Sequence, residues 1–195
     1  MRIYHMSDTL QLGDALKLDY KGQFTLAEPF MQALERSEEQ FYAMFLNGKY
    51  LRAVLGKHQL WEWTDYVRWS VEGAFEYIRR REFPHRCSRL KCNYFFDDLS
   101  SSKTLFENDW GSAPEEERMR IRLYEVELQD EQPQVCDMRL YDKAYDAMWD
   151  NEDLKTVLDC ARNYFSGGRT ETPVREFLSD QPAKTVADLT SYIHD

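Results

Sequence analysis

Three residues that lie far apart in the chain have side chains that could act on a ligand: His5, Tyr94 and Glu176. A carboxylate can stabilise positive charge that develops nearby during a reaction, and a tyrosine ring can stack on a flat ring. An imidazole can donate a hydrogen bond to a ligand hydroxyl group. Each residue also has an ordinary structural interpretation: a core or edge histidine, a tyrosine in a buried strand, and a solvated glutamate at a sheet edge.

The sequence around each residue predicts a β-strand. Residues 91–96 form a short apolar run with Tyr94 at its centre, and a Ser/Lys turn that could open a helix follows it. Because side chains alternate along a strand, Tyr94 and Phe96 are expected on one face. The same alternation in residues 174–178 groups Glu176 with Val174 and Leu178, so this acidic residue marks either a sheet edge or a site.

Other segments complete an α+β pattern without regular βαβ repeats. We expect a first strand over 3–6, helices over 28–81 with Pro29 in the first turn, and a half-buried strand over 121–128. Residues 141–165 are expected to be helical with a break near Asn151, and 174–178 to be the final strand. A short helix or tail is expected over 186–193. No linker is evident, so we expect one domain over 1–195 in which 28–81 is a helical insertion.

The net charge of −10 and pI near 5.0 do not favour nonspecific binding to DNA or membranes. The sequence has no apolar stretch of 18 residues and no signal-peptide core, so we expect a soluble cytoplasmic protein without membrane contact. The four cysteines form no Cys-x-x-Cys pair and are expected to be reduced.

The dense basic run at residues 79–91 is the exception to the acidic composition. It is either a solvated helix end, where cations suit the helix dipole, or an anion site, where arginine forks suit phosphates. Ser88 and Arg89 are the best-placed candidates for contacts to a pyrophosphate.

Several common chemistries lack their motifs in this sequence. It contains no Gly-x-Gly-x-x-Gly and no phosphate-binding Gly-x-x-x-x-Gly-Lys-Ser/Thr loop. It also contains no Gly-x-Ser-x-Gly and no His-Glu-x-x-His. An ordinary dinucleotide-binding βαβ unit is therefore not expected.

The three residues, taken in order, resemble the His-Tyr-Glu arrangement of ADP-ribosyltransferases of the diphtheria-toxin and poly(ADP-ribose)-polymerase type. Tyr4-His5 stands on the first strand, Tyr94 begins a Tyr-Phe-x-Asp motif followed by Ser-Lys, and Glu176 stands on a late strand. The resemblance implies a split β-sheet core with a helical insertion after the first strand. It also implies NAD as the substrate whose ADP-ribose is transferred.

The resemblance also implies roles for individual residues. Glu176 would bond the nicotinamide-ribose hydroxyl and orient the acceptor, and Tyr94 would stack on nicotinamide. His5 would hold the adenosine ribose, and Thr104 would contact the carboxamide.

This sequence departs from the family in three places. Met6 stands where a glycine is common, and the spacer between Asp97 and Lys103 is about one residue longer. Val174 replaces the second acidic residue of arginine-specific enzymes, which argues against arginine as the acceptor.

The resulting expectation is an NAD-dependent mono-ADP-ribosyltransferase acting on a macromolecule, with RNA or DNA slightly favoured over protein. A small transferase of this kind suggests a toxin of a toxin–antitoxin or antiphage defence system, covered by an antitoxin or chaperone partner. Two alternatives stay open. One is a catalytically inactive nucleotide- or partner-binding module of the same fold. The other is a structural interaction protein whose tryptophans, Trp61, Trp63 and Trp69, form an exposed aromatic patch.

Overall fold

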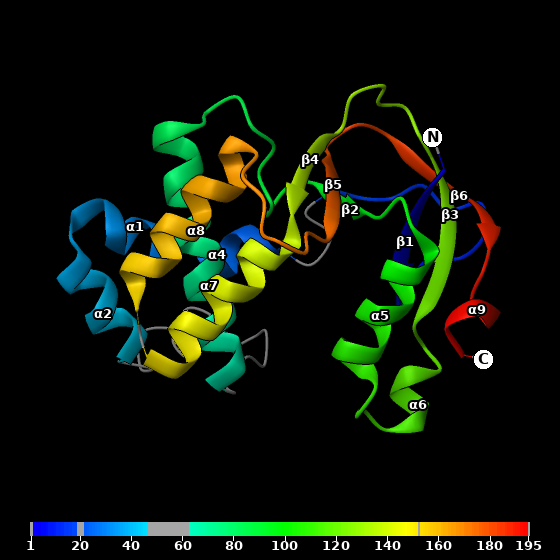
Figure 1. Cartoon of the computed structure of the whole chain (residues 1–195), viewed down its shortest axis with the longest axis horizontal. Helices are drawn as coiled ribbons and strands as arrows, with labels where there is room; N and C mark the ends of the chain where they lie inside the picture. Colours follow the sequence, from blue (N-terminus) through cyan, green and yellow to red (C-terminus); the bar gives the residue numbers. More distant parts are fainter. Residues whose placement is uncertain (1, 19–21, 47–62, 152, 195) are drawn as a thin grey trace. The chain divides into compact units, whose positions relative to one another are not determined.

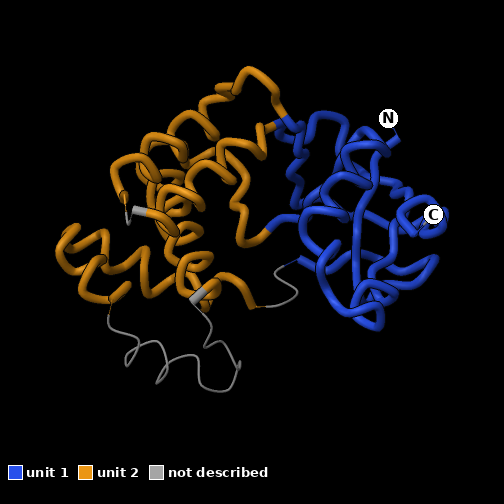
Figure 2. Tube along the Cα trace, turned by 60° about the horizontal axis from the view of Figure 1, so that its bottom comes forward, with its two compact units in different colours: residues 1–18, 92–135, 174–195 blue, residues 19–91, 136–173 orange. Residues whose placement is uncertain are grey.

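The computed structural model describes residues 2–18, 22–46, 63–151 and 153–194. Contacts between Cα atoms divide the chain into two compact units, each assembled from separate segments (Figure 2). Unit 1 contains residues 1–18, 92–135 and 174–195, and unit 2 contains 19–91 and 136–173. The sequence predicted one domain over 1–195 with a helical insertion at 28–81. That insertion falls within unit 2, which also contains residues 136–173.

Unit 1 is built on two three-stranded sheets (Figure 1). The first has the order β1 (Ile3–Ser7), β3 (Arg122–Leu128), β6 (Ala183–Asp188), and the second β2 (Asn93–Phe95), β5 (Arg175–Ser179), β4 (Gln134–Asp137). The last two residues of β4, Cys136 and Asp137, fall in unit 2. β1 and β2 meet at one antiparallel bridge, in which Tyr4 and Phe96 exchange main-chain hydrogen bonds of 2.7 and 2.9 Å. The arrangement is therefore a split sheet that parts between β1 and β2.

Both faces of β1 are buried, because successive side chains of a strand point to opposite faces. Ile3 belongs to a core cluster that joins the two sheets, with Phe95, Tyr124, Val126, Phe177 and Ala183. Tyr4 belongs to a second cluster, with Phe106, Ile121, Leu123 and Ile193. The second cluster includes residues of α5 (Leu99–Trp110) and α9 (Ser191–His194), and α6 (Glu115–Arg118) completes the helices described in this unit.

Unit 2 is helical, and the long helix α4 lies among the others. Its helices are α1 (Gln23–Arg36), α2 (Glu38–Leu46), α4 (Trp63–Glu82), α7 (Met138–Asn151) and α8 (Leu154–Ser166). α4 packs against each of the other four. Phe75 of α4 makes edge-on ring contacts with Tyr141, Tyr164 and Phe165, which come from the two late helices.

The structure bears out the mixed α+β composition and corrects several boundaries. The first helix begins at Gln23, so Pro29 lies inside it instead of in its first turn. Residues 186–188 belong to strand β6, so the expectation of a helix or tail from 186 onward was wrong there, and β5 is not the final strand. The predicted break near Asn151 is confirmed by the separation of α7 and α8.

Trp69 is buried, which removes it from the predicted aromatic patch, whereas Trp61 lies outside the described residues. Within the described chain, no helix combines enough length and apolar character to cross a membrane. The four cysteines, all within the described residues, form no disulfide bond with one another.

The crossing of α1 and α4 depends on Gly73. A Cβ atom added there would lie 2.7 Å from Cβ of Phe30 and 2.8 Å from the carbonyl oxygen of Ala27, and the latter is main chain that cannot rotate away. We expect Gly73→Ala to lower the free energy of unfolding by about 1–3 kcal/mol, despite the better helix propensity of alanine. Urea unfolding would measure this, with Arg68→Ala at an exposed position of α4 as the control. A stabilised Gly73→Ala protein would show that the two helices do not approach this closely.

Candidate active site on three neighbouring strands

The antiparallel pairing of β2 with β5 places Tyr94 and Glu176 on one face of their sheet. Tyr94 lies opposite Leu178, and Phe95 opposite Phe177. Alternation then puts Glu176 on the face of Tyr94 and Leu178, as a diagonal neighbour of Tyr94 at about 7–8 Å between Cα atoms. Phe95 and Phe177 point to the other face, into the core cluster that joins the sheets.

Glu176 is buried, with 3% of its surface exposed. The ordinary interpretation of this residue, a solvated glutamate at a sheet edge, therefore does not describe it. Tyr94 is half-buried on the neighbouring strand. A carboxylate held within a protein interior acts through a lower effective dielectric than water, which strengthens its interaction with a positive charge that forms nearby.

An ion pair extends the β2–β5 pairing past its last backbone-paired residues. Nη1 of Arg175 lies 2.6 Å from Oδ2 of Asp97, the aspartate of the Tyr-Phe-x-Asp motif. Continuing the register places these two residues opposite each other and Phe96 opposite Glu176. The Arg175 guanidinium also lies 5.0 Å from the ring centroid of Phe177. The two sequence motifs thus hold each other in register on both sides of Glu176.

His5 lies on β1 next to β2, but its side chain is not on the face of the two other candidate residues. Because Tyr4 pairs with Phe96, alternation puts His5 on the opposite face, with Phe95. Nδ1 of His5 lies 2.8 Å from the carbonyl oxygen of Tyr94, so this nitrogen carries the proton and donates it. Its ring centroid is 5.9 Å from that of Phe95. Burial lowers the pKa of His5 below 6.5, although the bond to the Tyr94 carbonyl acts in the opposite direction. The neutral ring therefore leaves Nε2 as an acceptor, so the predicted donor role toward a ligand hydroxyl group becomes an acceptor role.

The chain turns from β2 directly into α5. Asp98 caps this helix by accepting hydrogen bonds from the main-chain N–H groups of Ser100 and Ser101, each at 3.1 Å. The hydroxyl and amide of Ser100 lower the pKa of Asp98. The predicted helix start is thus confirmed. Thr104 lies on α5 and is exposed, whereas Ser102 is buried and donates to the main-chain oxygen of Asp98.

Asn93, which precedes Tyr94 on β2, was not among the predicted residues, and alternation puts its side chain on the face of Phe95, opposite to Tyr94 and Glu176. The Asn93 side chain is 8% exposed, and its Nδ2 has no hydrogen-bond partner among the described residues. A buried donor without a partner is costly, so a ligand oxygen or a water molecule would be stabilised there. A polar residue inside an apolar strand was the available signal.

Ser88 and Arg89, the expected pyrophosphate contacts, belong to unit 2 and bind carboxylates of α4. Ser88 donates to Glu76 at 2.9 Å. Arg89 is 7% exposed, pairs with Glu72 at 3.2 Å and donates to the hydroxyl of Tyr164 at 2.7 Å. Both side chains therefore bind partners within unit 2.

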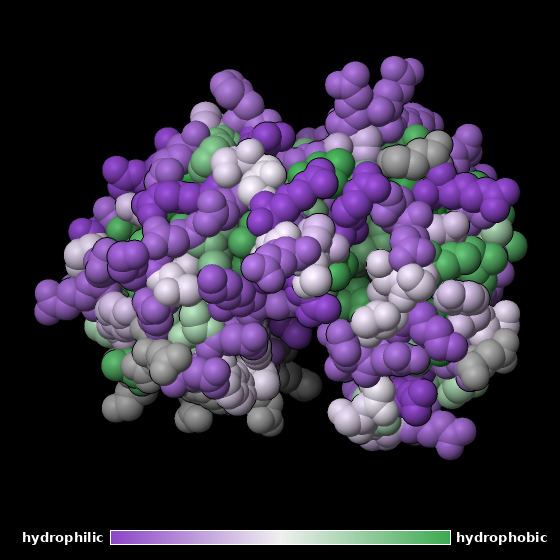
Figure 3. Space-filling view, viewed as in Figure 1, coloured by the Kyte–Doolittle hydropathy of each residue, from purple (hydrophilic) through white to green (hydrophobic). Residues whose placement is uncertain are grey.

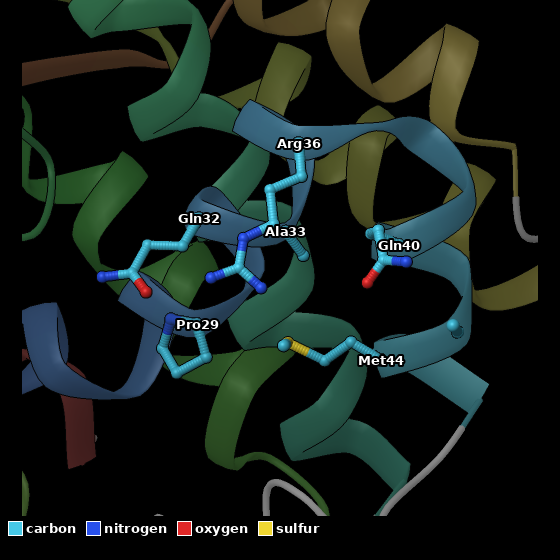
Figure 4. Close-up of a pocket in the computed structure, with 7 residues that line it drawn as sticks. Pro29, Gln32, Ala33, Arg36, Gln40 and Met44 are labelled. Carbon is cyan, nitrogen blue, oxygen red and sulfur yellow. The ribbon is translucent and has the colours of Figure 1, made fainter.

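A separate pocket of about 250 Å³ lies between α1 and α2 in unit 2. Side chains of Pro29, Gln32 and Arg36 from α1 and of Gln40 and Met44 from α2 surround it (Figure 4). It contains none of the predicted site residues and no carboxylate, imidazole or thiol, so it offers no acid–base or nucleophilic chemistry.

The fold and site define a class: an α+β protein with a split sheet whose central strands carry a histidine, a tyrosine and a buried glutamate. In the part of the chain that the structure describes, no three His, Cys, Asp or Glu side chains group as a metal site. Residues 3–192 match a family described as a protein of unknown function, DUF2441, and the chain belongs to that family. No curated protein matches the sequence.

The lowered pKa of His5 predicts a pH-dependent stability. The unfolded chain binds a proton as the pH falls through about 6.5 while folded His5 stays neutral, so the free energy of unfolding should fall in that range. His5→Gln should lack this part of the pH dependence. Urea unfolding of both proteins between pH 5 and 8 would measure it, and identical pH profiles would show that His5 is not the group responsible.

The Asp97–Arg175 pair is expected to contribute a coupling free energy of about 0.5–1 kcal/mol, because it is partly exposed and screened by solvent. A double-mutant cycle with Asp97→Asn and Arg175→Gln, followed by urea unfolding, would measure it. The control cycle is Arg2→Gln with Glu125→Gln, a looser pair at 3.7 Å whose arginine is 80% exposed. Equal coupling in the two cycles would contradict a role for Asp97 in holding the register.

Proposed function

We propose that this protein is an NAD-dependent ADP-ribosyltransferase with a macromolecular acceptor. The observation that carries the proposal is the burial of Glu176 on the same sheet face as Tyr94, with His5 bonded to the Tyr94 main chain from the adjacent strand. The resemblance implies a split sheet with helices after the first strand. The two three-stranded sheets and the helices that follow β1 are compatible with that expectation and support the proposal.

The proposed reaction breaks the bond between nicotinamide nitrogen and C1′ of ribose. The bonding electrons leave with nicotinamide, and the ribose acquires oxocarbenium character. Glu176 stabilises that positive charge and bonds a ribose hydroxyl group. An acceptor atom then forms a bond to C1′ and releases its proton, so the products are nicotinamide and the ADP-ribosylated acceptor.

The other two residues bind and orient NAD in this proposal. Tyr94 offers a flat ring to nicotinamide, which limits rotation of the leaving group at little cost in side-chain entropy. The Nδ1–H tautomer of His5, fixed by the Tyr94 carbonyl, leaves Nε2 to accept a hydrogen bond from the adenosine ribose. Thr104 would contact the carboxamide from α5. A toxin role with an antitoxin partner is part of the same proposal, from the family resemblance.

We expect Glu176→Gln to lower transfer of labelled ADP-ribose by about 10²–10³-fold, since the amide cannot supply the negative charge. The assay incubates the protein with labelled NAD and separate RNA, DNA and protein acceptors. The matched control is Glu171→Gln, which makes the same charge change at an exposed position five residues earlier. Circular dichroism would confirm that both variants fold.

The outcomes separate the candidate functions. Loss of transfer in Glu176→Gln alone supports the enzyme. Binding of NAD by the wild-type protein without cleavage would assign it as a silent nucleotide-binding module. Neither binding nor cleavage of NAD would overturn the proposal.

A further inference from the structure

The end of α4 and the loop after it form a connected group of cations on unit 2. Residues 76–91 contain six arginines and lysines and only two glutamates, in a chain with a net charge of −10. Arg79 and Arg80 both donate to Oε1 of Glu76, at 2.8 and 3.0 Å, so their guanidinium groups lie side by side. Arg80 and Lys91 both lie over the ring of Phe24, at 5.2 and 4.5 Å from its centroid.

Arg79 also fixes the loop that follows the helix. Its Nη1 donates to the carbonyl oxygens of Pro84 and Arg86 at 3.3 and 3.1 Å. The position of Arg86 is therefore tied to the same group of arginines. We refer to Arg79, Arg80, Arg81, Arg86 and Lys91, with the rings of Phe24 and Tyr77, as the basic face.

Part of the charge on the basic face is used for structure and part is not. Glu76 neutralises charge from Arg79 and Arg80; burial of this carboxylate raises its pKa, but Arg79 and its other donors outweigh burial and hold the pKa below its usual value. Three exposed cations, Arg81, Arg86 and Lys91, have no carboxylate within ion-pair distance among the described residues. A solvated helix end needs no such surplus, since the helix dipole is complemented within its last turn.

Aromatic rings lie beside these cations. Arg81 lies 5.2 Å from the ring centroid of Tyr77 and donates to its hydroxyl at 2.7 Å, and Lys91 lies over Phe24. Guanidinium groups that lie beside aromatic rings can pair with phosphates, and exposed rings and guanidinium planes can stack on bases. An acidic peptide would use the charges but not the stacking surfaces. In Figure 3 the face of unit 2 in view is largely hydrophilic, with smaller apolar patches.

We infer that the basic face binds single-stranded nucleic acid. If the proposed function is correct, the bound strand is the acceptor of ADP-ribose; only that step rests on the proposed function. Binding itself requires neither NAD nor Glu176, so it can be measured separately from transfer.

The test is fluorescence anisotropy of labelled 15-nucleotide uridine and thymidine strands, with wild-type protein and no NAD. We expect saturable binding. A plot of the logarithm of the affinity against the logarithm of the salt concentration should have a slope of about −2 to −3, because contacts to three or four phosphates release the counterions of those phosphates. The variant Arg81→Gln/Arg86→Gln/Lys91→Gln should bind at least about 10-fold more weakly, and its slope should be reduced by about 2.

The matched control removes three other exposed lysines, Lys17→Gln/Lys143→Gln/Lys184→Gln, with the same change in net charge. It should bind within about 3-fold of wild type if contacts at the basic face matter more than overall charge. The uridine and thymidine arms distinguish RNA from DNA.

Three results would overturn the inference: no saturable binding by the wild-type protein, equal weakening in both triple variants, or binding of a labelled polyglutamate peptide as tight as that of the strands. The last result would assign the face to an acidic protein partner. Because the binding assay contains no NAD, a failure of transfer stays distinct from a failure of binding.

Discussion

The candidate site depends on the antiparallel pairing of β2 with β5. A shift of one residue in this register would move every side chain of β5 to the opposite face, which would carry Glu176 away from Tyr94 and into the apolar core. Two interactions oppose that shift. Phe95 and Phe177 lie opposite each other and are both buried, and burying each ring stabilises the fold by about 1.5–3 kcal/mol. The Asp97–Arg175 pair then holds the strands beyond the paired residues.

Buried carboxylates organise unit 2 in a comparable way. Glu72 and Glu76 lie one helical turn apart on α4, and each binds a residue of the segment that follows the helix. Glu72 pairs with Arg89, and Glu76 accepts a hydrogen bond from Ser88. Arg89 also lies 4.2 Å from the ring centroid of Tyr141, and burial together with the nearby charge of Glu72 raises the pKa of that tyrosine well above 10. Removing one partner of a buried pair is far more costly than removing an exposed one. The arginines of this segment thus differ in their surroundings: Arg89 is buried and paired in the interior of unit 2, while Arg81 and Arg86 are exposed.

Local sequence patterns predicted which segments form helices and strands better than they predicted where those helices and strands begin and end. The alternation in residues 121–128 and the helical spacing in 141–165 corresponded to β3 and to α7 with α8. The helix limit at Pro29 was wrong because packing of α1 against α4 sustains the helix on both sides of a residue that normally marks a helix start. The last strand was missed because β6 gains its stability from pairing with β3, more than 50 residues earlier in the chain.

The sequence by itself determined the types and order of the candidate residues: a histidine on the first strand, a tyrosine before an aspartate-capped helix, and a glutamate on a late apolar strand. These are local features, set by side-chain alternation and capping. Only the tertiary structure decided that Glu176 is buried beside Tyr94 and that Ser88 and Arg89 bind carboxylates in the other unit. Both outcomes depend on pairings between segments far apart in the chain, and neither local propensity nor residue spacing encodes which distant group a side chain will meet.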